Sequence, residues 1–278
     1  MTDFDAYLKN SPFAKELSAA LNSAKEAGSI LRNHFGNAIK SDNKLVDGQT
    51  LGLVTQADLE SEQSIVKTLS AAFPSDTILG EESGLNCETQ TDRIWVVDPL
   101  DGTNNFACGV PHFAISIALW ENARPKLGVI HNPMTDDLFV CSAGEGAWHN
   151  TQRVSVNKNN ELNQCLVGTG FYYDRGEMMQ ATLRSIEMIF QQNVLGIRRF
   201  GAAALDLAWV GTGRYGAFFE FQLAPWDFAA GMLLVQEAGG QVTTCSNLPL
   251  DLVKSSVLAS NGYLHPQLHE IVSRFWNR

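Results

Sequence analysis

The sequence predicts a protein of the α+β class with layers of helix and sheet. Three observations support this prediction. Apolar residues recur at helical spacing in the first third of the chain, short β-prone segments follow one another in the middle third, and helical and strand patterns alternate in the last third. Sheets covered by helices account for that order of elements.

The first third contains two predicted helices separated by a loop. The first helix covers 13–35 and ends near Gly36, and the second ends at Pro74, which cannot continue a helix. Between them, the polar, glycine-containing stretch 39–58 is expected to be a loop that tightens into a short apolar run before Asp58. The helical positions are Leu17, Ala20, Leu21, Ala24, Leu31 and Phe35 in the first helix and Ile65, Val66, Leu69 and Phe73 in the second.

The middle third is rich in residues that favour strands. Its apolar runs are separated by Gly, Pro, Asn and Asp, as in "HNPMTDD" at 131–137. Such residues are typical of turns between successive strands, so we expect one sheet built largely from sequence neighbours. The predicted strands cover 77–79, 94–97, 113–120, 126–131 and 138–142.

The last part of the chain mixes helices with strands and offers one weak domain boundary. The polar segment "NKNNELNQ" at 157–164 is the only soft point in a chain that has no internal repeat. We therefore expect a single domain over 1–278, with any subdivision near 157–164. The predicted helices cover 177–192, 202–210, 226–238 and the residues after Pro266, and the predicted strands cover 217–220 and the region of Val257.

Composition limits the classes of function. The chain has 45% hydrophobic and 18% charged residues, as ordered globular proteins do. Its 30 acidic residues exceed its 20 Lys and Arg, which argues against a broad basic face for nucleic acid, so no direct nucleic-acid binding is expected.

The location of the protein is predicted from what the chain lacks. No apolar run approaches the roughly 20 residues needed to span a bilayer, and the N-terminus does not resemble a signal peptide. The five cysteines are scattered, with no C-x-x-C pair, which favours reduced thiols. We expect a soluble cytoplasmic protein with no membrane partner.

Acidic residues stand at the edges of apolar elements in three segments. These are "GEESG" with Glu81 and Glu82, "DPLDGT" with Asp98 and Asp101, and "APWDFAAG" with Asp227. Each has a simple structural interpretation when taken alone. The glutamates suit a solvated turn, "DPLDGT" suits a tight turn, and Asp227 suits the start of a helix.

Taken together, the acids indicate a metal site. Asp98 and Asp101 follow an apolar run, and sites collect at strand ends in αβ sheets. Clustered carboxylates repel one another and raise their own pKa values unless a cation neutralises them. Oxygen ligands with no Cys or His pattern nearby favour Mg²⁺ over Zn²⁺, and Mg²⁺ commonly shares its ligands with a substrate phosphate.

Gly102 and Thr103 add a seat for that phosphate. Glycine permits a tight turn with exposed backbone N–H groups, and a helical turn that starts at Thr103 would direct amide dipoles at an anion. Two metal ions about 3.5–4 Å apart can activate a water and stabilise the leaving group. The reaction class is hydrolysis of a phosphate monoester.

These motifs resemble the lithium-sensitive, magnesium-dependent phosphatases that include inositol monophosphatase. The signatures occur in order along the chain: "VTQAD" at 54–58, "GEES" at 80–83, "WVVDPLDGTNNF" at 95–106 and "PWDFAAG" at 225–231. Further segments, such as "GVPHFAISIAL" and "EAGGQVT", extend the similarity over nearly the whole chain. The resemblance implies a layered αβαβα sandwich of the sugar-phosphatase type.

The resemblance also implies the metal ligands. Glu81, Asp98 and the backbone carbonyl of Leu100 match the ligands of a first Mg²⁺. Asp98, Asp101 and Asp227 match the ligands of a second. A third, weaker ion is expected near Glu81, which gives two or three ions in all.

The same resemblance assigns catalytic and substrate-binding residues. Asp58 and Thr103 match the pair that orients and deprotonates the attacking water, and Glu81 completes the catalytic set. The substrate would meet Asp101, the amides of Gly102 and Thr103, Ala203, Glu220 and Asp227. Further candidates are Lys44, Glu82 and Arg199. Arg199 could instead form a solvated surface pair with Arg198.

The resulting prediction is Mg²⁺-dependent hydrolysis of myo-inositol 1-phosphate or a similar polyol phosphate by a metal-activated water, in a homodimer. Three alternatives keep the metal site and change the substrate: fructose-1,6-bisphosphatase, histidinol-phosphate phosphatase and nucleotide 3'-phosphatase. A different class also remains, a transcription-associated protein that contacts the RNA polymerase machinery.

Overall fold

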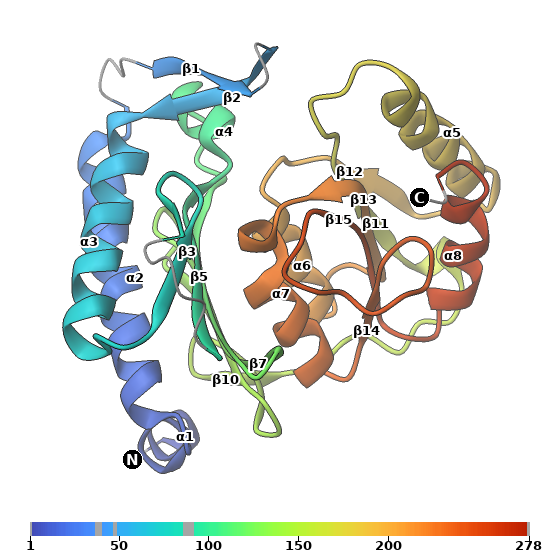
Figure 1. Ribbon diagram of the computed structural model, residues 1–278. Helices are drawn as coiled ribbons and strands as arrows, with labels where there is room; N and C mark the ends of the chain where they lie inside the picture. Colours follow the sequence, from blue (N-terminus) through green and yellow to red (C-terminus); the bar gives the residue numbers. More distant parts are fainter. Residues whose placement is uncertain (1, 37–40, 47–48, 86–91, 277–278) are drawn as a thin grey trace.

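Helical layers alternate with two β-sheets in the structure, a computed structural model that describes residues 2–36, 41–46, 49–85 and 92–276 (Figure 1). The order is helices, a large sheet, helices, a smaller sheet and helices. This arrangement confirms the predicted α+β class and the layered sandwich that the resemblance implies. Within the described residues, none of the helices is both long and apolar enough to cross a bilayer.

The first layer packs two long helices on the outer face of the large sheet. Both lie where helical spacing predicts them, and Phe73 and Pro74 follow the end of the second. A short helix precedes them and was not predicted. Thr2 and Asp5 cap it reciprocally, with N···O distances of 3.1 and 2.9 Å. The layer contains α1 (Asp3–Asn10), α2 (Ala14–His34) and α3 (Gln56–Ala72).

The large sheet joins strands that are mostly neighbours in sequence, as predicted. Its order is β10-β9-β8-β7-β6-β5-β3-β4, and every pair is antiparallel except β3 and β5. The strands are β3 (Thr77–Gly80), β4 (Gly84–Leu85), β5 (Arg93–Asp101), β6 (Ala114–Glu121), β7 (Arg124–Asn132), β8 (Asp137–Ser142), β9 (Gly146–His149) and β10 (Gln152–Val154).

Side chains of the large sheet alternate between two apolar clusters, because successive residues of a strand point to opposite faces. Strand β6 shows the pattern over its whole length, and helices cover both of its faces. Ile115, Ile117 and Leu119 join the cluster under α2 and α3, whereas Ala114, Ala118 and Trp120 join the cluster around the middle helices.

The middle layer consists of α6 (Ala203–Gly211) and α7 (Pro225–Glu237), which lie between the two sheets. Both are apolar on most sides, as a helix buried between two sheets must be. Their close approach depends on Gly231. A Cβ there would lie 2.6 Å from Cβ of Leu207, so any larger residue would separate the two helices.

The smaller sheet combines parallel and antiparallel strands in the order β12-β11-β13-β15-β14. The first three are parallel, whereas β15 is antiparallel to both β13 and β14. Helices α5 (Glu177–Gln191) and α8 (His265–Ser273) cover its outer face. The strands are β11 (Leu166–Thr169), β12 (Gly196–Arg198), β13 (Ala217–Leu223), β14 (Gln241–Thr243) and β15 (Ser255–Ser260).

The predicted loop at 39–58 is wrong. Its described part is a hairpin of β1 (Ser41–Val46) and β2 (Gln49–Thr55), in which Ser41 pairs with Thr55 and Asn43 with Leu53. The two strands are hydrogen-bonded to each other. Their sequences lack the alternation of apolar and polar residues from which a strand is predicted, so the hairpin was missed. The side chains of 41–53 lie outside the described residues, and with them the side chain of Lys44.

The other unpredicted elements are short. Strands of three or four residues, such as β11, β12 and β14, are too short for a periodic signal, and the helical turn η1 (Leu162–Gln164) has the same limitation.

The segment 157–164, where a subdivision of the domain was predicted, leads into β11. Asn157 in that segment donates to the carbonyls of Gly213 and Tyr215 at 2.9 and 3.0 Å. The single domain remains a prediction.

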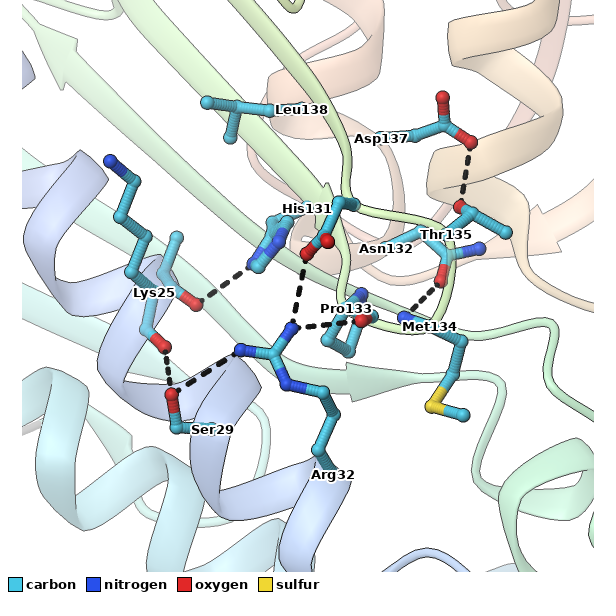
Figure 2. Close-up of polar contacts among 12 residues, drawn as sticks. Lys25, Ser29, Arg32, His131, Asn132, Pro133, Met134, Thr135, Asp137 and Leu138 are labelled. Atoms are coloured by element: carbon cyan, nitrogen blue, oxygen red, sulfur yellow. Dashed lines mark hydrogen bonds and ion pairs between the residues drawn. The ribbon is translucent and has the colours of Figure 1, made fainter.

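Helix α2 is anchored to the turn between β7 and β8 (Figure 2). Arg32 donates to the carbonyl of Pro133 at 2.9 Å and to Oδ1 of Asp136 at 3.2 Å. The Nδ1 atom of buried His131 donates to the carbonyl of Ala24 at 3.1 Å. Gly28 permits this contact, because a Cβ there would lie 2.8 Å from the imidazole ring.

Candidate active site

Strand ends bring the predicted acids together. Strands β3 and β5 are parallel neighbours, so Glu81 after β3 lies at the same edge as Asp98 and Asp101 at the end of β5. Asp227 comes from the first turn of α7. Asp98, Asp101 and Asp227 each place one carboxylate oxygen within 4.8 Å of the others.

Backbone amides position these three carboxylates. The register of β5 shifts between Asp98 and Asp101, and the amide of Leu100 donates to Oδ1 of Asp98 at 3.0 Å. The first amides of α6, on Ala203 and Ala204, donate to Asp101 at 3.2 and 2.7 Å. Asp227 accepts from the amide of Ala224 at 2.7 Å, so it does stabilise a helix start, as its simple interpretation suggests.

The carboxylates of this cluster lie close enough to repel one another, and Asp98 and Asp101 are buried. Burial raises the pKa of Asp98 well above its ordinary value, and the charges of Glu81, Asp101 and Asp227 raise it further. Burial also raises the pKa of Asp101 to about 7, although the amides of α6 oppose that shift. The Oδ2 atom of Asp98 is buried and has no hydrogen-bond partner among the described residues. A cation would satisfy that oxygen and offset the repulsion.

The donor set fits Mg²⁺. The groups that converge are carboxylates together with the carbonyl of Leu100, which lines the same cavity. Hard oxygen ligands are those that Mg²⁺ prefers, and the unpartnered oxygen of Asp98 is where a ligand atom is expected.

A second set of contacts links Asp58 to the cavity. The hydroxyl of Thr103 lies 3.0 Å from Oδ1 of Asp58 and 3.0 Å from the carbonyl oxygen of Leu100. Thr55 donates to Oδ2 of Asp58 through its amide at 2.8 Å and its hydroxyl at 2.5 Å. Burial raises the pKa of Asp58 to about 6, although the hydrogen bonds from Thr55 and Thr103 oppose the shift. Asp58 is therefore a buried carboxyl group with one oxygen held by Thr55 and one oxygen facing Thr103.

Gly102 makes the turn from β5 into α4 (Thr103–Ala107). Its φ of 96° is in the left-handed region that favours glycine. A Cβ at this position would lie 3.1 Å from the carbonyl oxygen of His112 and 3.3 Å from that of Gly201. Any other residue would therefore be strained and crowded, and would displace the peptide that is predicted to bind phosphate.

One cavity of about 360 Å³ gathers most of the predicted site. Asp58 lies behind Thr103 and does not line it. Glu82 is not in its lining, and the backbone amide of Glu82 donates to the carboxylate of Glu62 at 2.9 Å. The predicted residues that line the cavity are Glu81, Asp98, Leu100, Asp101, Gly102, Thr103, Arg199, Ala203, Glu220 and Asp227.

The Glu220 side chain leaves no room for a side chain at position 170. The Glu220 side chain comes from β13 and lies against Gly170, where a Cβ would be 1.7 Å from Oε2 of Glu220. Burial raises the pKa of Glu220, and the charge of Asp227 raises it further, whereas Arg199 lowers it. The two arginines differ, since Arg199 lines the cavity and Arg198 does not.

Sequence analysis missed several residues of the cavity. Asp206 is a buried acid inside the apolar helix α6, and an acid in such a helix is a signal that could have been noticed. Most of the others belong to loops with no periodic signal. They are Phe171, Tyr172, Tyr173 and Arg175 after β11, Gln222 at the end of β13, and Lys254 before β15.

Five alternating layers, with carboxylates gathered from the end of β5 and the start of α7, suit a phosphoric monoester hydrolase, the class that the family match shows. The chain belongs to the inositol monophosphatase family, whose sequence model matches residues 14–277. The inositol-1-monophosphatase of Caulobacter vibrioides is 39% identical over 253 residues, which cover 90% of this chain and 98% of that protein.

Two further relatives support the same family. The Nus factor SuhB of Pseudomonas aeruginosa is 40% identical over 250 residues, or 88% of this chain and 91% of that protein. The solved structure of an IMPase from Thermotoga maritima superposes with a TM-score of 0.84 at 33% identity, covering 94% of this chain and 97% of the other. The similarity therefore extends over nearly the full length of each protein.

Proposed function

We propose that this protein hydrolyses a small phosphate monoester with Mg²⁺, and that myo-inositol 1-phosphate or a similar polyol phosphate is its substrate. One observation carries the proposal. Three carboxylates whose oxygens lie within 4.8 Å of one another share a cavity with Thr103, which is hydrogen-bonded to the buried base Asp58. Family membership supports the reaction class.

Two sets of residues would hold Mg²⁺. Glu81, Asp98 and the carbonyl of Leu100 form the first set, and Asp98, Asp101 and Asp227 form the second, with a third ion near Glu81. Bound Mg²⁺ would neutralise the carboxylates, activate a water and draw charge from the phosphoryl oxygens. Leu100 can serve because its carbonyl oxygen has two lone pairs, and because the single proton of the nearby Thr103 hydroxyl is donated to Asp58 rather than to Leu100 in this arrangement.

The chain's own residues would manage the proton and the phosphate. The Thr103 hydroxyl can accept a hydrogen bond from the attacking water while it donates to Oδ1 of Asp58, so that a proton passes from water to threonine to aspartate. Thr55 holds the other oxygen of Asp58 and keeps the base in place. The amides of Gly102 and Thr103 would bind the phosphate oxygens.

The hydroxyls of the substrate would meet the part of the cavity wall that Glu220, Asp227 and Ala203 form. A carboxylate accepts hydrogen bonds from a polyol.

Phosphate release from a panel of esters tests the proposal. The panel contains myo-inositol 1-phosphate, fructose 1,6-bisphosphate, histidinol phosphate and adenosine 3',5'-bisphosphate, each with Mg²⁺ and with EDTA. A preference for the inositol ester that EDTA abolishes is the expected result. A preference for another ester would select one of the alternative phosphatases, and turnover in EDTA would contradict the metal assignment.

A second candidate function is a role in transcription, which rests on the 40% identity to a protein named Nus factor SuhB. In that role the protein would contact the RNA polymerase machinery rather than nucleic acid directly. A variant without turnover, such as Asp98→Asn, separates the two functions. If it still binds the transcription machinery, the second role is independent of catalysis.

A homodimer and a cytoplasmic location complete the proposal. Large apolar side chains stay exposed on and beside α5, among them Leu183, Phe190 and Leu195, as a subunit contact would require. Cys108, Cys141, Cys165 and Cys245 are free thiols, consistent with a reducing compartment. Sedimentation of the purified protein tests the dimer.

A further inference from the structure

A buried carboxylate on helix α3 contacts the turn that carries Glu81. The carboxylate is that of Glu62, whose Oε2 accepts from the amide of Glu82 at 2.9 Å and whose Oε1 accepts from the amide of Ser83 at 2.8 Å. Burial of a charged side chain is costly unless its polar atoms are bonded, and here each carboxylate oxygen has an amide donor. These two hydrogen bonds fasten the turn to α3.

The turn is held from two sides. It consists of residues 81–83 and joins β3 to its antiparallel neighbour β4. At its start, the amide of Glu81 donates to the carbonyl of Val97 at 3.1 Å, and Val97 directly precedes the proposed ligand Asp98 in β5. The remaining two amides of the turn are those that Glu62 accepts. A three-residue turn held in this way leaves the backbone of Glu81 little freedom, and its side chain lines the cavity.

The same face of α3 holds two further segments of the site. Helix α3 packs against β5 (Figure 1), and Asp58, Ser61 and Glu62 lie on one side of it because they are three and four residues apart. The buried hydroxyl of Ser61 donates to the carbonyl of Pro99, in the part of β5 that supplies ligands, at 2.9 Å. Asp58 contacts Thr103. One helix therefore connects three segments of the site that are distant in sequence.

We propose that Glu62 is a positioning residue for Mg²⁺, which holds the turn so that Glu81 is in place before the first ion binds. The inference rests on the proposed function. Glu62 acts through the two backbone amides and not through contact with the ion. When the turn is released, only a fraction of the molecules keeps Glu81 in place, and the apparent affinity for the ion falls by that fraction. A bound ion then holds Glu81 itself, so turnover at saturating Mg²⁺ depends much less on Glu62.

Calorimetric titration of the metal-free protein with Mg²⁺ tests this role. In Glu62→Gln the side-chain carbonyl can still accept, but the NH₂ group would meet the second backbone N–H, so the turn loses a hydrogen bond. The Kd for Mg²⁺ should rise about tenfold. At saturating Mg²⁺, kcat and the KM for the phosphate ester should each change by less than about threefold. A role in stability alone would lower the unfolding temperature of the metal-free protein and leave the Kd unchanged.

Gly80→Ala separates positioning from charge. A Cβ at position 80 would lie 2.7 Å from Oε2 of Glu62 and 2.9 Å from Oγ of Ser83, so the carboxylate and the turn must move apart while the charge of Glu62 remains. The Kd for Mg²⁺ should therefore rise in this variant as it does in Glu62→Gln. Glu60→Gln is the matched control, because it removes an acid from the same helix whose side chain is 41% exposed and pairs with His34. It should leave the Kd unchanged.

Three outcomes would overturn the role of Glu62: an unchanged Kd in both variants, a rise in Glu62→Gln alone, which would assign the effect to charge, or an equal rise in Glu60→Gln. If Glu62→Gln does not fold, Gly80→Ala decides the question. The titration does not depend on turnover, so if no ester is hydrolysed the phosphatase proposal fails by itself and the role of Glu62 is still decided. A wild-type protein that binds no Mg²⁺ would reject both the metal assignment and the positioning role.

Discussion

The hydroxyl of Thr103 lies 3.0 Å from Oδ1 of Asp58, and Thr55 holds the other oxygen of that carboxylate with two hydrogen bonds. The contact joins the start of α4 to the first turn of α3, two helices that follow different sheet strands. Asp58 is buried behind Thr103, so Thr103 is the group through which it reaches the cavity.

Thr103→Val should therefore lower kcat by about 10²-fold or more, because it removes the hydroxyl but keeps the shape of the side chain. Thr103→Ser keeps the hydroxyl and is the matched control, with a much smaller loss. Steady-state kinetics and thermal unfolding of both variants provide the measurement. If valine and serine give similar rates, the proton path through Thr103 is wrong.

Asp98→Asn should lower turnover by about a hundredfold or more at saturating Mg²⁺, because Asp98 belongs to both proposed ligand sets. The fold should survive, since the change removes a buried charge that neighbouring carboxylates repel. In the wild type, Mg²⁺ at 100 times its Kd should add about 2.7 kcal/mol to the free energy of unfolding.

Calorimetric melting with and without Mg²⁺ checks that prediction, and the Asp98→Asn variant should lose most of the Mg²⁺ effect. Glu187→Gln, an exposed acid on α5, is the control and should keep it. Near-normal turnover of Asp98→Asn would reject the two-metal assignment.

Gly170→Ala should raise KM more than it lowers kcat. The new Cβ would lie within 1.7 Å of Oε2 of Glu220, so the Glu220 side chain must leave its place on the cavity wall. The carboxylate would then contact the hydroxyls of a polyol less well. Gly211→Ala, whose Cβ would make only ordinary contacts at 3.4 Å and beyond, is the control and should leave KM unchanged.

Li⁺ should inhibit the enzyme at millimolar concentration. A group of carboxylates suited to a small hard cation can admit Li⁺ in place of Mg²⁺. Phosphate release measured over a range of LiCl, with KCl at equal ionic strength as the control, provides the test. Equal rates in the two salts would contradict the prediction.

Stability should depend on His265 below neutral pH. The ring is buried and hydrogen-bonded to Ser260 at 2.9 Å and to Thr243 at 3.0 Å, and burial lowers its pKa from 6.5 to about 4. The unfolded chain takes up this proton near pH 6.5 and the folded chain only near pH 4. The contribution of neutral His265 is therefore complete above pH 6.5 and is lost as the pH falls to 4.

Urea unfolding of the wild type and of His265→Gln between pH 7 and pH 4 measures that contribution, which is at most about 3 kcal/mol at 1.36 kcal/mol per pKa unit. The variant should be less stable at neutral pH but should lose less stability on acidification. Parallel pH profiles of the two proteins would show that His265 does not titrate on unfolding.

Long, repetitive patterns in the sequence determined much of the fold. Helical spacing of apolar residues predicted α2 and α3. The apolar runs of β5, β6, β7 and β8 predicted the large sheet, because a strand that is buried on both faces needs apolar residues along its whole length. The hairpin β1–β2 and the short strands of the smaller sheet carried no such pattern. Their hydrogen bonds come from partner strands, which a single segment does not reveal.

The same division holds for the site. The sequence by itself identified Asp98 and Asp101, because charged residues directly after a buried strand require a physical explanation. Only the tertiary structure decided that Asp227 approaches them, that Thr103 meets Asp58, and that Arg199 lines the same cavity. These contacts join segments far apart in the chain, where packing of the layers, and no local preference, fixes the distances.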